Sequence, residues 1–158
     1  MPKNKRFNLW VIVGLLSILL FTIYIFHKHQ SEINCIDEYR QDSIILAPDG
    51  TQMAVEISAD PVTQAKGLSG RQCIANDWGM LFSFKDSDIR QFWMKDMNFP
   101  IDIVWIDENF QVVGVETNVS PDTYPQTFAS PSPVKFVLET GANQAEDLGL
   151  VTGATVTF

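Results

Sequence analysis

The sequence predicts a mainly β domain of the α+β class, a small β-barrel or sandwich-like fold with one or two short helices, preceded by a single transmembrane helix. Two observations predict this fold class. An uncharged apolar run lies near the N-terminus, and short β-prone runs alternate with turn signals after residue 42. A chain of 158 residues is about one domain long. We therefore expect an N-terminal signal anchor over residues 1–30, a stalk over 31–42 and a β-rich domain over 43–158.

The apolar run Leu9–Phe26 contains 18 residues and no charge. Spanning a bilayer core takes about 20 apolar residues, within a range of about 17–25. Lys3, Lys5 and Arg6 precede the run, whereas Lys28 alone follows it. Because positive charge favours the cytoplasmic side, we expect a single-pass membrane protein with a cytoplasmic N-terminus. The domain then lies outside the cytoplasm, in the periplasm or on the cell surface.

A cleaved signal peptide is the alternative to an uncleaved anchor. Signal peptides have a shorter apolar core and a cleavage site made of small residues. The end of the run, Tyr24–Lys28, offers no such site. A lipid-modified cysteine is also disfavoured, because Glu32, Ile33 and Asn34 precede Cys35 in place of the small residues that lipidation requires. The sequence therefore favours an anchor that stays attached, with the membrane as a partner through the N-terminal helix.

The rest of the chain is strongly acidic. Residues 31–158 hold 7 basic and 19 acidic residues, so their formal charge is 7 − 19 = −12. Such a domain repels phosphate backbones, which argues against a nucleic-acid partner.

The candidate strands of the domain are separated by turn signals. Pro48-Asp49-Gly50 and Asp107-Glu108-Asn109 each lie between two β-prone runs, as in hairpins. The expected strands are Ile44–Ala47, Met53–Ser58, Gly79–Phe84, Gln91–Met94, Ile101–Ile106, Gln111–Glu116, Val134–Glu139 and Ala154–Phe158.

Two short helices are expected. Pro61–Leu68 has Asp60 at the N-cap and Pro61 at the first helical position, and Asn143–Leu148 ends before Gly149. Between the strands, Ser120–Pro133 contains four prolines. Proline removes a backbone donor and fixes φ, so we expect an irregular surface segment there.

Cys35 and Cys73 are the two cysteines of the chain. An even number of cysteines in an oxidising compartment is consistent with a disulfide, which would stabilise the domain by roughly 2–4 kcal/mol. The spacing alone leaves two separate thiols as an alternative. Both histidines lie beside the apolar run, so the domain has neither a Cys/His zinc cluster nor a histidine-activated nucleophile. We expect no cofactor and no metal.

Four local patterns occur in one order along the domain. They are Gly67-Leu68-Ser69-Gly70-Arg71, Gly79-Met80-Leu81-Phe82-Ser83-Phe84, Phe92-Trp93-Met94-Lys95-Asp96-Met97-Asn98-Phe99-Pro100-Ile101-Asp102, and Val137-Leu138-Glu139-Thr140-Gly141-Ala142. With the closing glycines Gly149 and Gly153, this order resembles the family called domain of unknown function 192. The resemblance covers about Ser43–Phe158 and implies a compact β-rich fold without an established activity. The family's usual form has Met, Asn and Thr where this chain has Ser69, Asp96 and Met97.

Four charged residues stand among apolar or glycine neighbours in these patterns: Arg71, Lys95, Asp102 and Glu139. Burying a charge is costly unless it is paired. One interpretation is two internal ion pairs that fix the register of the strands. The other is a ligand-binding pocket in which the four charges converge beside Trp93 and Trp78.

Three functions are compatible with these observations. The first is a non-enzymatic module that binds a small polar or carbohydrate-like ligand through Arg71, Trp93, Lys95, Asp102 and Glu139. The second is an accessory protein of the cell envelope that docks a protein partner through Ser120–Pro133. The third is a hydrolase in which Asp102 and Glu139 form an acid/base pair, a role that requires carboxyl groups about 5–10 Å apart.

Overall fold

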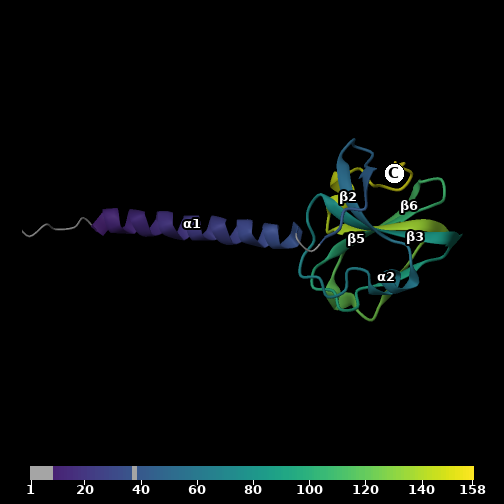
Figure 1. Cartoon of the computed structure of the whole chain (residues 1–158), viewed down its shortest axis with the longest axis horizontal. Coiled ribbons are helices and arrows are strands. Elements are labelled where there is room, and N and C mark those ends of the chain that lie inside the picture. The colour runs from purple at the N-terminus through teal and green to yellow at the C-terminus, as the bar shows by residue number, and fades with distance from the viewer. Residues whose placement is uncertain (1–8, 37–38) are drawn as a thin grey trace, which may run out of the picture. The chain divides into compact units, whose positions relative to one another are not determined.

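The computed structural model describes residues 9–36 and 39–158 of the chain, without the side chains of residues 9–11, 28–34 and 36. The chain divides into two units, residues 1–37 and residues 38–158. In the first unit the structure has a single helix, α1 (Leu9–Ile36), within its described part (Figure 1). Among the residues whose side chains are described, no helix combines the length and the apolar character that crossing a membrane requires.

The second unit is built on a six-stranded sheet with the strand order β1-β2-β3-β8-β5-β6, and β4 and β7 form a separate two-stranded sheet. The strands are β1 (Ser43–Leu46), β2 (Gln52–Ser58), β3 (Trp78–Asp88), β4 (Gln91–Trp93), β5 (Ile101–Ile106), β6 (Val112–Val119), β7 (Thr127–Ala129) and β8 (Val134–Gly141). Only the β2–β3 pair is parallel among these pairings; the others are antiparallel.

Of the two predicted architectures, β-barrel or sandwich-like, the barrel is wrong, because the described strands form no closed barrel. Strands β1 and β6 are the two edges of the large sheet and do not pair with each other in the described domain. The C-terminal segment, predicted as a strand over Ala154–Phe158, forms isolated bridges instead, Thr157 with Leu46 and Thr155 with Gln111. This segment therefore covers both edges of the sheet without continuing it. The coarser prediction, a mainly β fold with a few short helices, is confirmed.

Short helices lie in the connections between strands. Helix α2 (Pro61–Lys66) begins where the Asp60 side chain accepts hydrogen bonds from the backbone N–H groups of Val62 and Thr63. Helix α3 (Gln144–Asp147) follows β8 and packs on β8 and β5. Figure 1 shows α2 and the C-terminal segment on opposite sides of the sheet.

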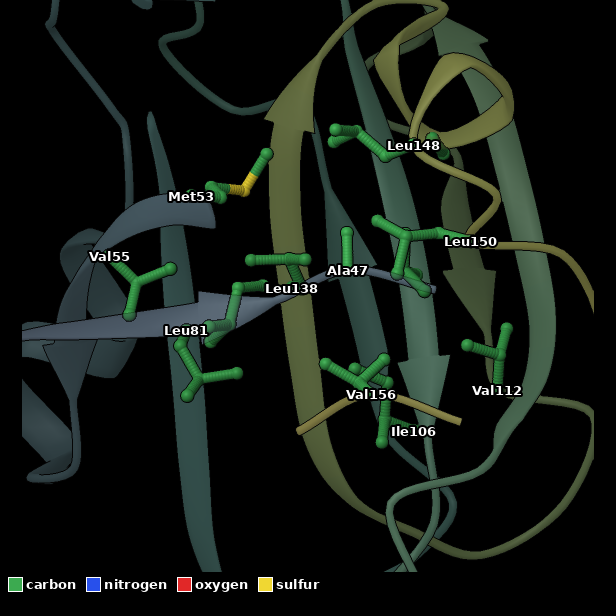
Figure 2. Packing of buried hydrophobic residues seen from close by; sticks show 13 residues of the cluster. Ala47, Met53, Val55, Leu81, Ile106, Val112, Leu138, Leu148, Leu150 and Val156 are labelled. Atoms are coloured by element: carbon green, nitrogen blue, oxygen red, sulfur yellow. The ribbon is translucent and has the colours of Figure 1, made fainter. Parts of the chain in front are cut away.

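The sheet is buried on both faces by two apolar clusters. On one face, Val104, Ile106 and Leu138 pack with side chains from β1, β2, α3 and the C-terminal segment, and Figure 2 shows these side chains directed toward one another. On the other face, Ile103, Trp105 and Val137 pack with Phe82 and with residues of the α2 and β4 connections. Because side chains alternate along a strand, successive residues of β5 and β8 belong to different clusters.

Ser120–Pro133 is more regular than predicted. A 3₁₀ turn spans Pro121–Thr123, and β7 pairs with β4 through Phe128 and Phe92. The prediction of an irregular segment was wrong for β7, because its residues contain no proline and have a partner strand. Phe128 is partly buried against the core, whereas Tyr124 is 46% exposed. Docking of an envelope protein on this segment stays a prediction.

Residues 39–42, in the expected stalk, contact the domain. Tyr39 stacks on Trp78 with ring centroids 4.1 Å apart, and the Trp78 indole N–H donates to the Arg40 carbonyl at 3.0 Å. Asp42 accepts a hydrogen bond from the Ile57 N–H at 2.9 Å. These contacts hold the start of the second unit against β2 and β3.

Candidate pocket with a buried carboxyl

A pocket of about 310 Å³ opens on the face of the sheet that carries α2. Its wall comes from α2 and the turn after it, from β3, from β4 and from Glu139 of β8. The residues that line the pocket include Gln64, Lys66, Gly67, Phe82, Phe84, Phe92, Trp93 and Glu139. Most of them are aromatic or polar, as in sites for small molecules.

Helix α2 is fixed to the sheet by its own side chains. The Gln64 amide donates to the Ser83 carbonyl at 3.0 Å, which ties the helix to β3. At the end of the helix, Gly67 has φ +50°, a conformation that side chains disfavour. A Cβ at Gly67 would lie 3.3 Å from the Phe82 ring and 4.0 Å from Glu139 Oε2. Glycine therefore lets the backbone approach the buried carboxyl closely.

Glu139 lies in the middle of the sheet. It is opposite Met80 on β3 and Ile103 on β5, so its side chain emerges on the apolar face that carries α2. The residue is 5% exposed, and its Oε2 atom has no hydrogen-bond partner among the described residues. Burial raises the pKa of Glu139 to about 8, and the positive charge of Arg71 opposes this rise. At neutral pH the carboxyl is therefore mostly protonated.

Aromatic rings form the remainder of the wall. Phe82 and Phe92 meet edge to face with centroids 4.8 Å apart, and Phe92 meets Trp105 at 5.6 Å. Trp93 is 51% exposed and touches Tyr124 edge to face at 6.2 Å. Lys95 Nζ lies 5.9 Å from the Trp93 ring centroid. Lys95 is therefore at the pocket through Trp93, although it does not itself line the pocket.

Arg71 pairs with a residue that the sequence analysis did not single out. Its Nη2 atom lies 2.7 Å from Glu56 Oε2, and both side chains are nearly buried. The guanidinium also lies 5.1 Å from the Trp78 ring centroid. Glu56 was not predicted as a site residue, because the sequence of β2 predicts only a half-buried strand. That sequence does not show that Arg71 lies close to Glu56 in the fold.

Asp102 is not part of the pocket. It is fully buried on β5 opposite Thr140, one residue out of step with Glu139, and therefore projects from the other face of the sheet. Its carboxylate accepts backbone N–H groups of Asn118 at 2.7 Å, Asn143 at 2.9 Å and Ala145 at 2.9 Å. This carboxylate holds the end of β6 and the start of α3 in place.

The expected convergence of four charges is therefore wrong, and so are the two ion pairs expected among them. The structure brings Glu139, Trp93 and, at the rim, Lys95 to one pocket. It places Arg71 with Glu56 and places Asp102 on the opposite face. An acid/base pair of Asp102 and Glu139 is excluded because the sheet separates the two carboxyl groups.

Cys35 and Cys73 are both disulfide-bonded, and neither is a free thiol. Their pairing with each other stays the prediction made from the cysteine count. No cluster of three or more His, Cys, Asp or Glu side chains suited to a metal ion occurs in the described part of the chain.

Fold and pocket together define a class: a mainly β domain whose central strand presents one buried, unpaired carboxyl to an aromatic pocket. The chain belongs to the DUF192 family, described as an uncharacterised ACR, whose model matches residues 44–158. The four sequence patterns that resemble this family contribute most of the pocket wall, including Gly67, Phe82, Trp93 and Glu139.

Two solved structures are similar to the chain. One, from Sinorhizobium meliloti 1021, is described as a candidate transcription regulator; it is 29% identical with a TM-score of 0.66, over 72% of this chain and 88% of that chain. The other, a protein of unknown function from Novosphingobium aromaticivorans DSM 12444, is 26% identical with a TM-score of 0.67, over 73% and 82%. The search among curated proteins finds no match.

Proposed function

We propose that the domain is a non-enzymatic module that binds a small polar or carbohydrate-like ligand in the pocket beside α2. The observation that carries this proposal is the buried Glu139 carboxyl, which lines the pocket and has an oxygen without a partner among the described residues. Buried polar atoms in proteins are nearly always hydrogen-bonded. We propose that a ligand in the pocket completes this one, because Glu139 lines the pocket.

The half-exposed ring of Trp93 supports the same proposal. Aromatic side chains with one face apolar and accessible provide contact area for ligands at a small entropic cost. Trp93 is at once the most exposed tryptophan described here and part of the lining of the pocket. A ligand in the pocket therefore meets an aromatic platform at the rim and a carboxyl at the buried end.

The side chains around the pocket favour binding over catalysis. Ser69 donates its hydroxyl hydrogen to the Lys95 carbonyl at 2.8 Å, so it is engaged as a structural donor. The sequence has no histidine after His29 that could activate a nucleophile. Glu139 has no second carboxyl beside it among the described lining residues, which suits recognition better than glycoside hydrolysis.

The description of the Sinorhizobium structure raises DNA binding as a second candidate for this chain. The charge of the chain opposes it, because residues 31–158 carry 7 basic against 19 acidic residues. DNA-binding domains neutralise phosphates with clustered basic residues. Ligand binding is therefore the function that we propose.

We also propose that the N-terminal run anchors the domain at the membrane, with the domain outside the cytoplasm. The support for this is the sequence, 18 residues from Leu9 to Phe26 without a charge and with the larger positive charge on the N-terminal side. In addition, apolar side chains such as Leu16, Leu20 and Phe26 are exposed on α1, and contiguous exposed apolar surface marks an interaction site.

Isothermal titration of the full-length chain with monosaccharides, amino acids and muropeptide fragments tests the binding function. We expect at least one of these compounds to bind, and Trp93→Ala to weaken its binding at least tenfold. Phe110→Ala is the matched control, because Phe110 is 40% exposed and lies outside the pocket lining. Equal weakening by both variants, or binding that neither changes, would contradict the pocket as the binding site.

A further inference from the structure

We propose that the ligand of this pocket carries an ammonium group, held by the Glu139 carboxylate and by the aromatic rings around it. This inference rests on the proposed function and specifies the ligand class of the same site. It is carried by three features: the apolar surroundings of the Glu139 carboxyl, the lack of an ion pair to it from any described cation of the chain, and the rings that line the pocket.

The first feature is the surroundings of the carboxyl. Glu139 is flanked in the sheet by Met80 and Ile103, which offer no hydrogen bond from their side chains, and its Oε2 lacks a partner within the described domain. It is the only acidic side chain among the described residues that line the pocket. A buried carboxylate requires a cation or several donors to be stable. A ligand ammonium supplies both the charge and, unless it is fully substituted, N–H donors.

The second feature is that the cations of the protein do not supply this charge. Arg71 lowers the pKa of Glu139 without restoring its usual value, because its guanidinium is bonded to Glu56 at 2.7 Å on β2. Lys66 lines the pocket from the exposed end of α2 and makes no ion pair among the described residues. Lys95 lies over Trp93 at the rim. No described cation of the chain forms an ion pair with Glu139, and we assign that position to the ligand ammonium.

The third feature is the aromatic wall. Phe82, Phe92 and Trp93 line the same pocket as Glu139. Ring faces attract cations, most strongly those of Trp, and aromatic cages bind quaternary ammonium groups. The chain already places cations on two of the lining rings, Arg90 at 4.1 Å from Phe84 and Lys95 at 5.9 Å from Trp93. Phe82 is fully buried and meets Phe92 edge to face at 4.8 Å, so the ring that is open to a ligand ammonium is the half-exposed one of Trp93.

A neutral ligand is the alternative outcome, and pH separates the two. A neutral acceptor binds the protonated carboxyl, so its affinity falls as pH rises through the pKa of about 8. An ammonium ligand binds the carboxylate, so its affinity rises over the same range. With that pKa, the ionised fraction of Glu139 grows about 50-fold between pH 6 and pH 8.

The test uses choline, whose charge is independent of pH, and its neutral isostere 3,3-dimethylbutan-1-ol, with glucosamine and glucose as a second pair. We expect choline to bind the full-length chain at pH 8 at least tenfold more tightly than the neutral isostere. Its affinity should fall about 50-fold at pH 6. Titrations at pH 7 in two buffers of different ionisation enthalpy should show close to one proton released per choline bound.

Two variants complete the test. Glu139→Gln keeps the size of the side chain and should remove both the choline affinity and its pH dependence, whereas Glu116→Gln removes the same charge outside the pocket and should change neither. Trp93→Phe tests the cage with a conservative change at an exposed position and should weaken choline several-fold. Circular dichroism checks that each variant is folded.

The outcomes distinguish this inference from the function on which it rests. If glucose or the neutral isostere binds as tightly as the charged partner and loses affinity on Trp93→Ala, the ammonium inference is overturned and the binding function stands. If neither the charged nor the neutral probes bind, and the wider titrations also give no signal, both are overturned.

Discussion

Glu139 is an ionisable residue at a buried position of the sheet. Its two strand neighbours are Met80 and Ile103, and burial raises its pKa to about 8. A carboxyl with a raised pKa in the folded state binds a proton more tightly there than in the unfolded chain. Its contribution to stability is therefore fully present below the ordinary pKa of 4.5 and is lost as pH rises toward about 8.

This linkage gives the first prediction. The full-length chain should lose about 4 kcal/mol of unfolding free energy between pH 5 and pH 9 relative to Glu139→Gln, which has no proton to lose. Urea denaturation of both proteins at pH 5, 7 and 9 measures the difference. The expected result is that the variant gains stability relative to the natural chain as pH rises; parallel curves for the two proteins would show that folding does not raise the pKa of Glu139.

Asp102 shows the opposite solution to burying a carboxyl. It is as buried as Glu139, but three backbone N–H groups donate to its two oxygens. Hydrogen bonds to an ionised acceptor are about twice as strong as neutral ones. Asp102 and Glu139 are both buried acids on neighbouring strands, but they project from opposite faces of the sheet. The Asp102 carboxylate accepts structural hydrogen bonds, whereas Glu139 Oε2 has no partner among the described residues.

The second prediction follows from these bonds. Asp102→Ala leaves the N–H groups of Asn118, Asn143 and Ala145 without their acceptor, and each unsatisfied buried donor costs about 1–3 kcal/mol. We expect a loss of at least about 3 kcal/mol in unfolding free energy by urea titration at pH 7. Glu116→Ala, an acid outside these bonds, is the control. A loss below 1 kcal/mol would contradict a structural role for Asp102.

At the scale of the elements, the sequence predicts strands better than their partners. Ile101–Ile106 is found with its predicted bounds, and the other internal strands of the large sheet differ from prediction at their ends only. Local pattern and turn residues determine these strands. The parallel pairing of β2 with β3 and the exclusion of the C-terminal segment from the sheet depend on contacts distant in sequence, which no local pattern contains.

For the pocket, too, the sequence predicted individual residues better than the contacts between them. Glu139 and Trp93 stood out because a charge in an apolar strand and an aromatic beside a lysine are visible in the sequence. Phe82 and Phe92 looked like ordinary core residues, although they also line the pocket. The partner of Arg71 could not be found, because Glu56 reaches it only through the pairing of β2 with β3.

The pair of Arg71 and Glu56 carries the third prediction. It joins the turn after α2 to β2 with side chains 11% and 13% exposed. We expect Glu56→Gln and Arg71→Met each to destabilise the chain, and the double variant to cost less than the sum, with a coupling of about 1–3 kcal/mol. A double-mutant cycle by urea denaturation measures it. Additive losses would mean that the two charges stabilise the turn independently.

At the scale of the whole domain, one sheet separates two interiors with different roles. The cluster shown in Figure 2 packs side chains of α3 and of the C-terminal segment against the sheet, and Asp102 projects from the same face. The opposite cluster is covered by α2 and the β4–β7 pair and borders the pocket. The binding function that we propose therefore belongs to the face that carries Glu139, and the three hydrogen bonds of Asp102 belong to the other face.

The place of the domain in the cell gives the last prediction. If Leu9–Phe26 anchors the chain with its N-terminus in the cytoplasm, alkaline phosphatase fused after Phe158 should be active in a bacterial host, and green fluorescent protein fused at the same point should be dark. Replacing Lys3, Lys5 and Arg6 by Glu should reduce phosphatase activity, because positive charge retains the N-terminus inside. Deleting residues 9–26 should release both fusions into the cytoplasm. Bright fluorescence with an inactive phosphatase in the unaltered chain would place the pocket inside the cell, and its ligand would then have to be sought among cytoplasmic compounds.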